Sequence, residues 1–213
     1  EVTSREPVPP LDFDEWAAIC ADFVGEIDQI PPMYSALKQN GKRLYELARQ
    51  GQSVERKPRR IHIFELALLE AFGRRLVFRV RCSKGTYIRT LVEDIAKAAG
   101  TVAYTSNLHR ERVGPFPARA MMDLADAERR AAQDFEGLRA AMLPVDTALE
   151  AMPQAALSAD LMARFLQGQA VEGGSGAAGL VRVYGPSGRF LGVAERAGDG
   201  LLRPQRIFHL AEN

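Results

Sequence analysis

This sequence is short of long apolar runs and of cysteine. Its longest apolar runs, within 213 residues, fall far short of the roughly 20 residues that a membrane-spanning helix requires. Nothing near its start resembles a secretory signal peptide. Its two cysteines, Cys20 and Cys82, are far apart and have no metal-type spacing. These absences favour a cytoplasmic, reduced protein with no membrane partner.

Histidine is equally scarce, which argues against metal catalysis. The residues His62, His109 and His209 are scattered, with no paired spacing typical of zinc ligands. The stretch "SKGT" lacks the remaining positions of a nucleotide-binding phosphate loop. Cys82 falls on the expected apolar face of a strand, so we interpret it as a packing residue. We therefore expect no metal site.

The net charge is only +1, but the charge is unevenly distributed. The first 31 residues carry mostly acids, whereas the stretch from Lys38 to Arg60, here called the basic segment, carries mostly bases. Its cations are Lys38, Lys42, Arg43, Arg49, Arg56, Lys57, Arg59 and Arg60. Such asymmetry indicates either a surface that faces a polyanion or a solvated helix and loop. Charge alone does not separate these alternatives.

The apolar periodicity predicts a fold of the α+β class. Helical spacing is found over residues 10–27, 87–99, 123–133 and 135–142, and strand alternation over 59–72, 74–83 and 101–114. The two strands flanking Gly73 are expected to form a hairpin. Beyond a boundary near residues 144–153 the composition changes to glycine-rich turns and short strands. That change predicts a small β-rich module of residues 148–213.

Arg89 stands out in the stretch "CSKGTYIRTL", at the start of the predicted helix 87–99. A cation there opposes the helix dipole. One interpretation is a surface ladder in which Arg89, Glu93 and Lys97 pair at a spacing of four residues. The alternative is that Arg89 points into a site and binds a carboxylate or phosphate. Tyr87 would then offer a ring for stacking on a base.

Several motifs together resemble one family. The stretches "IPPMYSALKQNGKRLYELARQG", "CSKGTYIRTL", "SNLHRERVGPF" and "LLRPQRIFH" follow in this order. In combination they resemble the bacterial TruB family of tRNA pseudouridine synthases, from about Leu11 onward. The resemblance implies a mixed-sheet synthase core, whose C-terminal portion is residues 1–147 with an RNA-binding insertion at about 11–58. It also implies a PUA-like domain at 148–213.

The resemblance also implies roles for individual residues. Arg89 matches the arginine that pairs with the catalytic aspartate, and Tyr87 matches the tyrosine that stacks on the extruded base. Leu108 matches an apolar residue of the uracil pocket, and Lys84 is expected to contact the substrate. The expected RNA-binding residues are Lys38, Lys42, Arg43, Tyr45 and Arg49.

One family feature is missing from this sequence. The nucleophilic aspartate belongs to a motif of the type G-x-L-D-x-x-A-x-G, and no such motif occurs among these residues. The aspartates that are present, such as Asp94, do not match it. Because the sequence also starts at Glu1, we expect an upstream portion that supplies the nucleophile.

The function expected from the resemblance is conversion of the T-loop uridine at position 55 of tRNA into pseudouridine, without metal or organic cofactor. The full enzyme is expected to be a monomer that binds the tRNA T arm, and this segment alone is expected to be inactive. Two alternatives remain open. One is an RNA-binding or tRNA-folding module without catalysis. The other is a structural protein whose basic segment only aids solubility.

Overall fold

The computed structural model describes residues 3–39 and 41–208. The chain forms two compact units, Glu1–Leu108 and His109–Asn213, and each is considered by itself. The domain boundary predicted at 147/148 falls inside the second unit, within the short 3-10 helix η2 (Val145–Leu149). That boundary stays a prediction.

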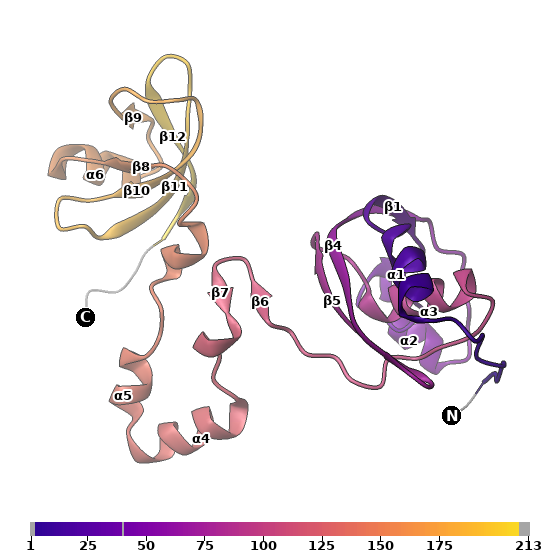
Figure 1. The fold of residues 1–213 in the computed structure, drawn as a ribbon. Coiled ribbons are helices and arrows are strands. Elements are labelled where there is room, and N and C mark those ends of the chain that lie inside the picture. The colour runs from indigo at the N-terminus through magenta and orange to yellow at the C-terminus, as the bar shows by residue number, and fades with distance from the viewer. Residues whose placement is uncertain (1–2, 40, 209–213) are drawn as a thin grey trace. The chain divides into compact units, whose positions relative to one another are not determined.

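The first unit packs helices against one antiparallel sheet of order β1-β4-β5 (Figure 1). A separate two-stranded ribbon, β2 with β3, precedes the short helix α2. In chain order the elements are α1 (Phe13–Ala21), β1 (Gly25–Gln29), β2 (Lys38–Gln39), β3 (Lys42–Arg43), α2 (Leu44–Arg49), β4 (Arg59–Phe72), β5 (Arg75–Cys82) and α3 (Ile88–Ala98).

Helix α1 is shorter than its sequence pattern predicted. Its start is a reciprocal cap, in which the Asp12 carboxylate accepts from the Glu15 N–H at 2.9 Å and the Glu15 carboxylate accepts from the Asp12 N–H at 2.8 Å. The helix ends at Ala21, and Gly25, with φ of 105°, opens β1. The predicted continuation of this helix through residue 27 was wrong, because Ile27 pairs with Ile61 in β4.

The core of the first unit lies between the sheet and helices α1 and α3. Strands β4 and β5 form the predicted hairpin, with Gly73 in the left-handed conformation at its turn. Helix α3 confirms the predicted helix to within one residue at each end. One apolar cluster joins α1, β4 and α3, and Cys82 packs against it as predicted; its buried members are Trp16, Cys20, Ile61, Ile63, Leu91 and Ile95.

The strand predicted over residues 101–114 was wrong over most of its length. Residues 102–111 are not paired in any described sheet, and all but Thr105 are exposed. Only β6 (Arg112–Val113) forms, as one arm of a short hairpin with β7 (Phe116–Pro117). Strand-like alternation does not produce a strand where no neighbouring strand supplies backbone partners.

The second unit combines short helices with a five-stranded sheet of order β8-β10-β11-β12-β9. Strand β8 runs parallel to β10, and the other pairs are antiparallel. After β7 the elements are η1 (Ala118–Ala120), α4 (Leu124–Gln133), α5 (Phe135–Ala140), η2, β8 (Gln154–Ala156), α6 (Ala159–Leu166), β9 (Val171–Glu172), β10 (Gly179–Tyr184), β11 (Phe190–Arg196) and β12 (Leu201–Ile207).

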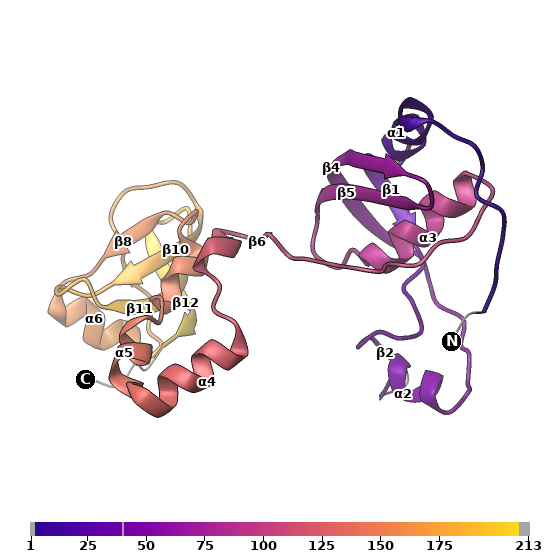
Figure 2. The same ribbon diagram turned by 60° about the horizontal axis from the view of Figure 1, so that its bottom comes forward.

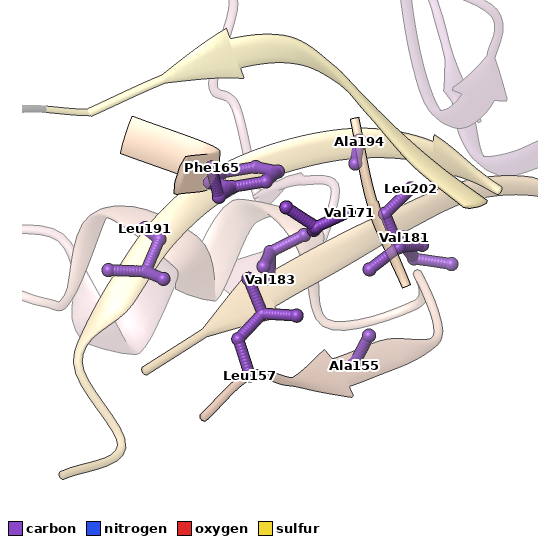
Figure 3. Packing of buried hydrophobic residues seen from close by; sticks show 9 residues of the cluster. All are labelled: Ala155, Leu157, Phe165, Val171, Val181, Val183, Leu191, Ala194 and Leu202. Carbon is purple, nitrogen blue, oxygen red and sulfur yellow. The ribbon is translucent and has the colours of Figure 1, made fainter. Parts of the chain in front are cut away.

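The core of the second unit lies between its sheet and α6. Figure 3 shows Phe165 of α6 close to the apolar side chains of the strands, among them Val183 and Leu191, all fully buried. Helices α4 and α5 confirm the two helices predicted there, yet they contain no buried residue. The predicted α+β class and β-rich C-terminal portion are thus confirmed, whereas the PUA-like domain stays a prediction.

Candidate functional site

The turn before α3 is tied to the neighbouring strand. The Ser83 hydroxyl accepts from the His62 backbone N–H at 3.0 Å, and the Ser83 N–H donates to the His62 carbonyl at 2.8 Å. Gly85, with φ of 85°, makes the turn itself. The Thr86 hydroxyl does not cap the helix; it donates back to the Ser83 carbonyl at 2.9 Å. Tyr87 therefore occupies the N-cap position.

A buried glutamine holds the backbone of Tyr87. The side chain of Gln29, at the end of β1, donates from Nε2 to the Tyr87 carbonyl at 3.1 Å and accepts from the Tyr87 N–H at Oε1 at 2.8 Å. Gln29 is only 1% exposed. The same Tyr87 carbonyl accepts the first helical bond, from the Leu91 N–H at 3.0 Å. Sequence reasoning missed Gln29, since a single polar residue at a strand end carries no distinctive pattern.

Arg89 is exposed in the first turn of α3. Its Nη2 donates to the backbone carbonyl of Tyr34 at 3.1 Å. Within residues 3–39 and 41–208, no carboxylate forms an ion pair with it. The ladder of Arg89, Glu93 and Lys97 does not form either, because Lys97 binds Asp94 at 3.5 Å. The structure thus presents an arginine at a helix start, bound to one neutral carbonyl.

Two other expected substrate residues lie at the surface. Lys84 is exposed in the turn before α3. Leu108 is 60% exposed at the end of the first unit, outside the buried clusters of the described residues. The predicted substrate-binding roles of both residues stay predictions.

The structure brings three of the expected RNA-binding residues together. Arg43 donates to the Tyr45 hydroxyl at 2.8 Å, and this bond raises the pKa of Arg43 further above its ordinary value. The guanidinium carbons of Arg43 and Arg49 lie 5.8 and 5.5 Å from the centre of the Tyr45 ring. Lys38 and Lys42 lie next to this cluster, on the ribbon β2–β3. Figure 2 shows β2 and α2 at the end of the unit away from α1.

An open groove of about 360 Å³ accompanies the basic segment. Arg56 joins two parts of the groove lining, because its Nη1 donates to the Pro31 carbonyl at 3.1 Å. Its Nε has no partner among the described residues. Arg60 is occupied differently: it pairs with Glu26 and Asp28, each at 3.1 Å. The groove is lined by Pro31, Leu37, Lys38, Gln39, Leu44, Glu55, Arg56, Lys57 and Arg59. This excess of cations suits an anionic ligand.

The second unit has a polar cluster that the sequence did not single out. The Tyr184 hydroxyl donates to Asp146 at 2.5 Å and accepts from Arg182 at 3.2 Å. Burial and the bond to Asp146 raise the pKa of Tyr184 above its ordinary value. An open pocket of about 370 Å³ lies beside it. The Arg182 guanidinium also binds the carbonyls of Met152 and Glu150, so this cluster fixes the start of the sheet region.

Neither a metal site nor a membrane span is found in the described part of the chain. No three His, Cys, Asp or Glu side chains there lie close enough together to hold a metal ion. His209, one of the scattered histidines, lies outside the described residues. In residues 3–39 and 41–208, no helix has the length and apolar character that crossing a membrane requires.

Three family models match consecutive parts of the chain. The model described as "TruB family pseudouridylate synthase (N terminal domain)" matches residues 1–88. The one described as "tRNA pseudouridylate synthase B C-terminal domain" matches residues 89–150. The model "Pseudouridine synthase II TruB, C-terminal" matches residues 153–208.

Curated relatives agree with these models. The chain is 43% identical over 212 residues to tRNA pseudouridine synthase B of Dechloromonas aromatica (strain RCB), covering 100% of the chain and 69% of that protein. It is 48% identical over 197 residues to the protein of the same name in Burkholderia mallei (strain NCTC 10247), covering 89% of the chain and 64% of the relative. The chain thus spans about two thirds of the length of the curated relatives it matches.

Solved structures show that the fold is similar to known ones. "Crystal Structure of a Cbf5-Nop10-Gar1 Complex" matches with a TM-score of 0.69 at 24% identity, over 94% of this chain and 63% of that one. "Structure of H/ACA RNP bound to a substrate RNA containing 2'-deoxyuridine" matches with a TM-score of 0.69 at 22% identity, over 95% and 63% of the two chains. At these identities the likeness concerns the fold alone.

Proposed function

The chain belongs to the TruB family of pseudouridine synthases, and from this premise we propose that the protein containing it converts uridine into pseudouridine at position 55 of the tRNA T loop. The observation that carries the proposal is the start of α3, where Tyr87 is held by its backbone and Arg89 lies two residues further on. Arg89 has no carboxylate partner in residues 3–39 and 41–208, as expected for an arginine whose partner is supplied from elsewhere.

In the proposed mechanism, Arg89 holds an aspartate from the upstream part of the protein ionised and oriented. That aspartate attacks the nucleoside covalently, and its bond to the nucleoside breaks again before the product leaves. The bond from C1′ of the ribose to N1 of uracil breaks, and a bond from C1′ to C5 forms. The C5 hydrogen leaves as a proton and N1 gains one, so no redox cofactor is consumed. Tyr87 stacks on the extruded base, and Leu108 and Lys84 complete the substrate site.

The basic segment supplies the RNA-binding surface in this proposal. Arg43, Tyr45 and Arg49 combine charge with an aromatic face, which suits phosphates and unstacked bases of the T arm. The β-rich residues 148–213 are proposed to be a PUA-like domain that also contacts the tRNA. The naming of relatives as tRNA pseudouridine synthase B supports the choice of tRNA as substrate.

We further propose that the protein acts as a cytoplasmic monomer and that residues 1–213 alone are inactive, because the motif G-x-L-D-x-x-A-x-G is absent from them. A non-catalytic RNA-binding module remains the alternative, favoured by the exposed cations of the basic segment. Both functions require RNA binding, so only turnover distinguishes them.

The test uses the natural gene product that contains this chain and a tRNA transcript with tritium at C5 of its uridines. Release of about one equivalent of tritium per tRNA is expected, because C5 loses its hydrogen when it bonds to the ribose. A transcript with cytidine at position 55 serves as the control and should release none. Tight binding of both transcripts without any release would contradict the enzyme proposal and favour the binding module.

A further inference from the structure

We propose that Gln29 is a positioning residue for the reaction. It fixes the start of α3, so that Tyr87 and Arg89 are correctly placed relative to the substrate. The inference rests on the function proposed above. Gln29 itself is buried, so it acts through the backbone of Tyr87 and does not touch RNA.

The Gln29 amide binds Tyr87 as a neighbouring strand would. Its donor faces the Tyr87 carbonyl and its acceptor faces the Tyr87 N–H, at 3.1 and 2.8 Å. Tyr87 has extended backbone angles, φ −99° and ψ 102°, so a paired strand could make the same two bonds. The two bonds also determine which way round the amide lies, since a flipped amide would place donor against donor. A glutamine therefore replaces a missing strand at this point.

The segment that follows β1 makes a second contact with the start of α3. Five residues after Gln29, the carbonyl of Tyr34 accepts from the Arg89 guanidinium at 3.1 Å. The intervening residues include Pro31 and Pro32, whose fixed φ angles restrict the connection. Pro31 is also bound through its carbonyl by Arg56. One short, stiff segment thus fixes both the backbone of Tyr87 and the side chain of Arg89.

A purely structural role for Gln29 predicts a different outcome from a positioning role. If the role is only structural, the Gln29 variant should unfold at a lower temperature, but the molecules that remain folded should form pseudouridine at the wild-type rate. A positioning role would lower the rate of the folded protein, because a shift of about 1 Å in a reacting group reduces turnover by about 100-fold. The affinity for tRNA should barely change, because Gln29 is buried, whereas the cations Arg43 and Arg49 are exposed and make no bond to it.

The experiment compares Gln29→Met with the wild type in the natural gene product. Methionine keeps the length of the side chain and removes both bonds. We expect single-turnover tritium release about 10- to 100-fold slower, tRNA binding within about twofold of wild type, and faster hydrogen exchange at the Tyr87 amide. Gln167→Met is the matched control, because Gln167 is exposed in the second unit and accepts only one exposed bond, from Gln169. It should leave all three quantities unchanged.

Should Gln29→Met fail to fold, Gln29→Asn carries the test, because it retains a polar amide that is one methylene too short for both bonds. A rate within threefold of wild type in a folded variant would overturn the proposal. An equal loss of rate and affinity would overturn it as well. If the wild-type protein releases no tritium, the proposed function is wrong. If the wild type releases tritium and the Gln29 variant does so equally fast, only the positioning role of Gln29 is wrong.

Discussion

At the start of α3, polar groups are held by a buried side chain and by backbone carbonyls, whereas in the basic segment exposed cations surround one tyrosine. Gln29 is 1% exposed and makes two bonds to Tyr87. Arg43 and Arg49 are exposed and approach the Tyr45 ring at 5.8 and 5.5 Å. One region fixes the positions of a few atoms; the other presents charge over an area.

This difference fits the two functions proposed for the first unit, which are catalysis at the start of α3 and RNA binding at the basic segment. Chemistry depends on the placement of reacting groups to within a fraction of an ångström. Attraction of a polyanion depends on the number of nearby cations and is weakened by salt. We therefore expect substitutions at the start of α3 to change the rate and substitutions in the basic segment to change the affinity.

The largest expected effect comes from Arg89→Ala in the natural gene product. Without the guanidinium the attacking carboxylate is no longer held in place, so we expect turnover to fall by about 100- to 1000-fold. Affinity for tRNA should fall by no more than about threefold. Tritium release and equilibrium binding measure the two quantities. Arg75→Ala, which removes an exposed arginine at the end of the hairpin, is the control. Comparable turnover of the two variants would contradict the role of Arg89.

A smaller effect is expected from the double variant Arg43→Ala/Arg49→Ala. Removing two cations that are proposed to bind phosphates should reduce the slope of log affinity against log salt by about 1.5 and weaken binding by about tenfold at low salt. Turnover of bound tRNA should remain near the wild-type value. Binding titrations over a range of salt concentrations measure the slope.

The matched control for this double variant is Arg129→Ala/Arg139→Ala, which removes the same charge from exposed positions of α4 and α5. An equal change of slope in the control would mean that overall charge, and not the basic segment, governs binding. The basic segment would then have no special part in tRNA affinity.

The smallest effect is expected from Asp12→Ala, which removes the reciprocal cap of α1. Loss of such a cap costs about 1 kcal/mol of the free energy of unfolding. Urea denaturation followed by circular dichroism measures it, with Asp14→Ala as the exposed neighbouring control. Neither the rate nor the salt slope should change while the protein remains folded. A changed rate would show that α1 is coupled to the start of α3.

Local patterns in the sequence predicted the hairpin β4–β5, helix α3 and the β-rich end of the chain. In each case the signal was carried by neighbouring residues, such as Gly73 at the turn or the apolar stripe through Leu91 and Ile95. The end of α1 was misjudged because Ile27 continues a helical spacing while its pairing partner, Ile61, is far along the chain. Sequence periodicity does not reveal such distant pairing.

For the candidate site, sequence reasoning proposed residues but not the contacts that hold them, and the roles of those residues stay predictions. The expected site residues fall within contiguous motifs that resemble the family; they include Tyr87, Arg89 and, in the basic segment, Lys38, Lys42, Arg43, Tyr45 and Arg49. The resemblance did not reveal Gln29, which lies 58 residues from Tyr87 and acts through two backbone bonds. Nor did it show that Arg89 donates to the Tyr34 carbonyl, since any residue type offers such a carbonyl.

The position of Trp16 gives the molecule a built-in optical reporter. It is the only tryptophan in the sequence, and it is 6% exposed in the core of the first unit. Its fluorescence therefore reports the packing of α1 against β4 and α3. Unfolding of the second unit alone is expected to leave the emission spectrum of Trp16 unchanged. Emission spectra and total helical signal, recorded together, distinguish unfolding of the unit that carries Arg89 from unfolding of the β-rich unit, without any label.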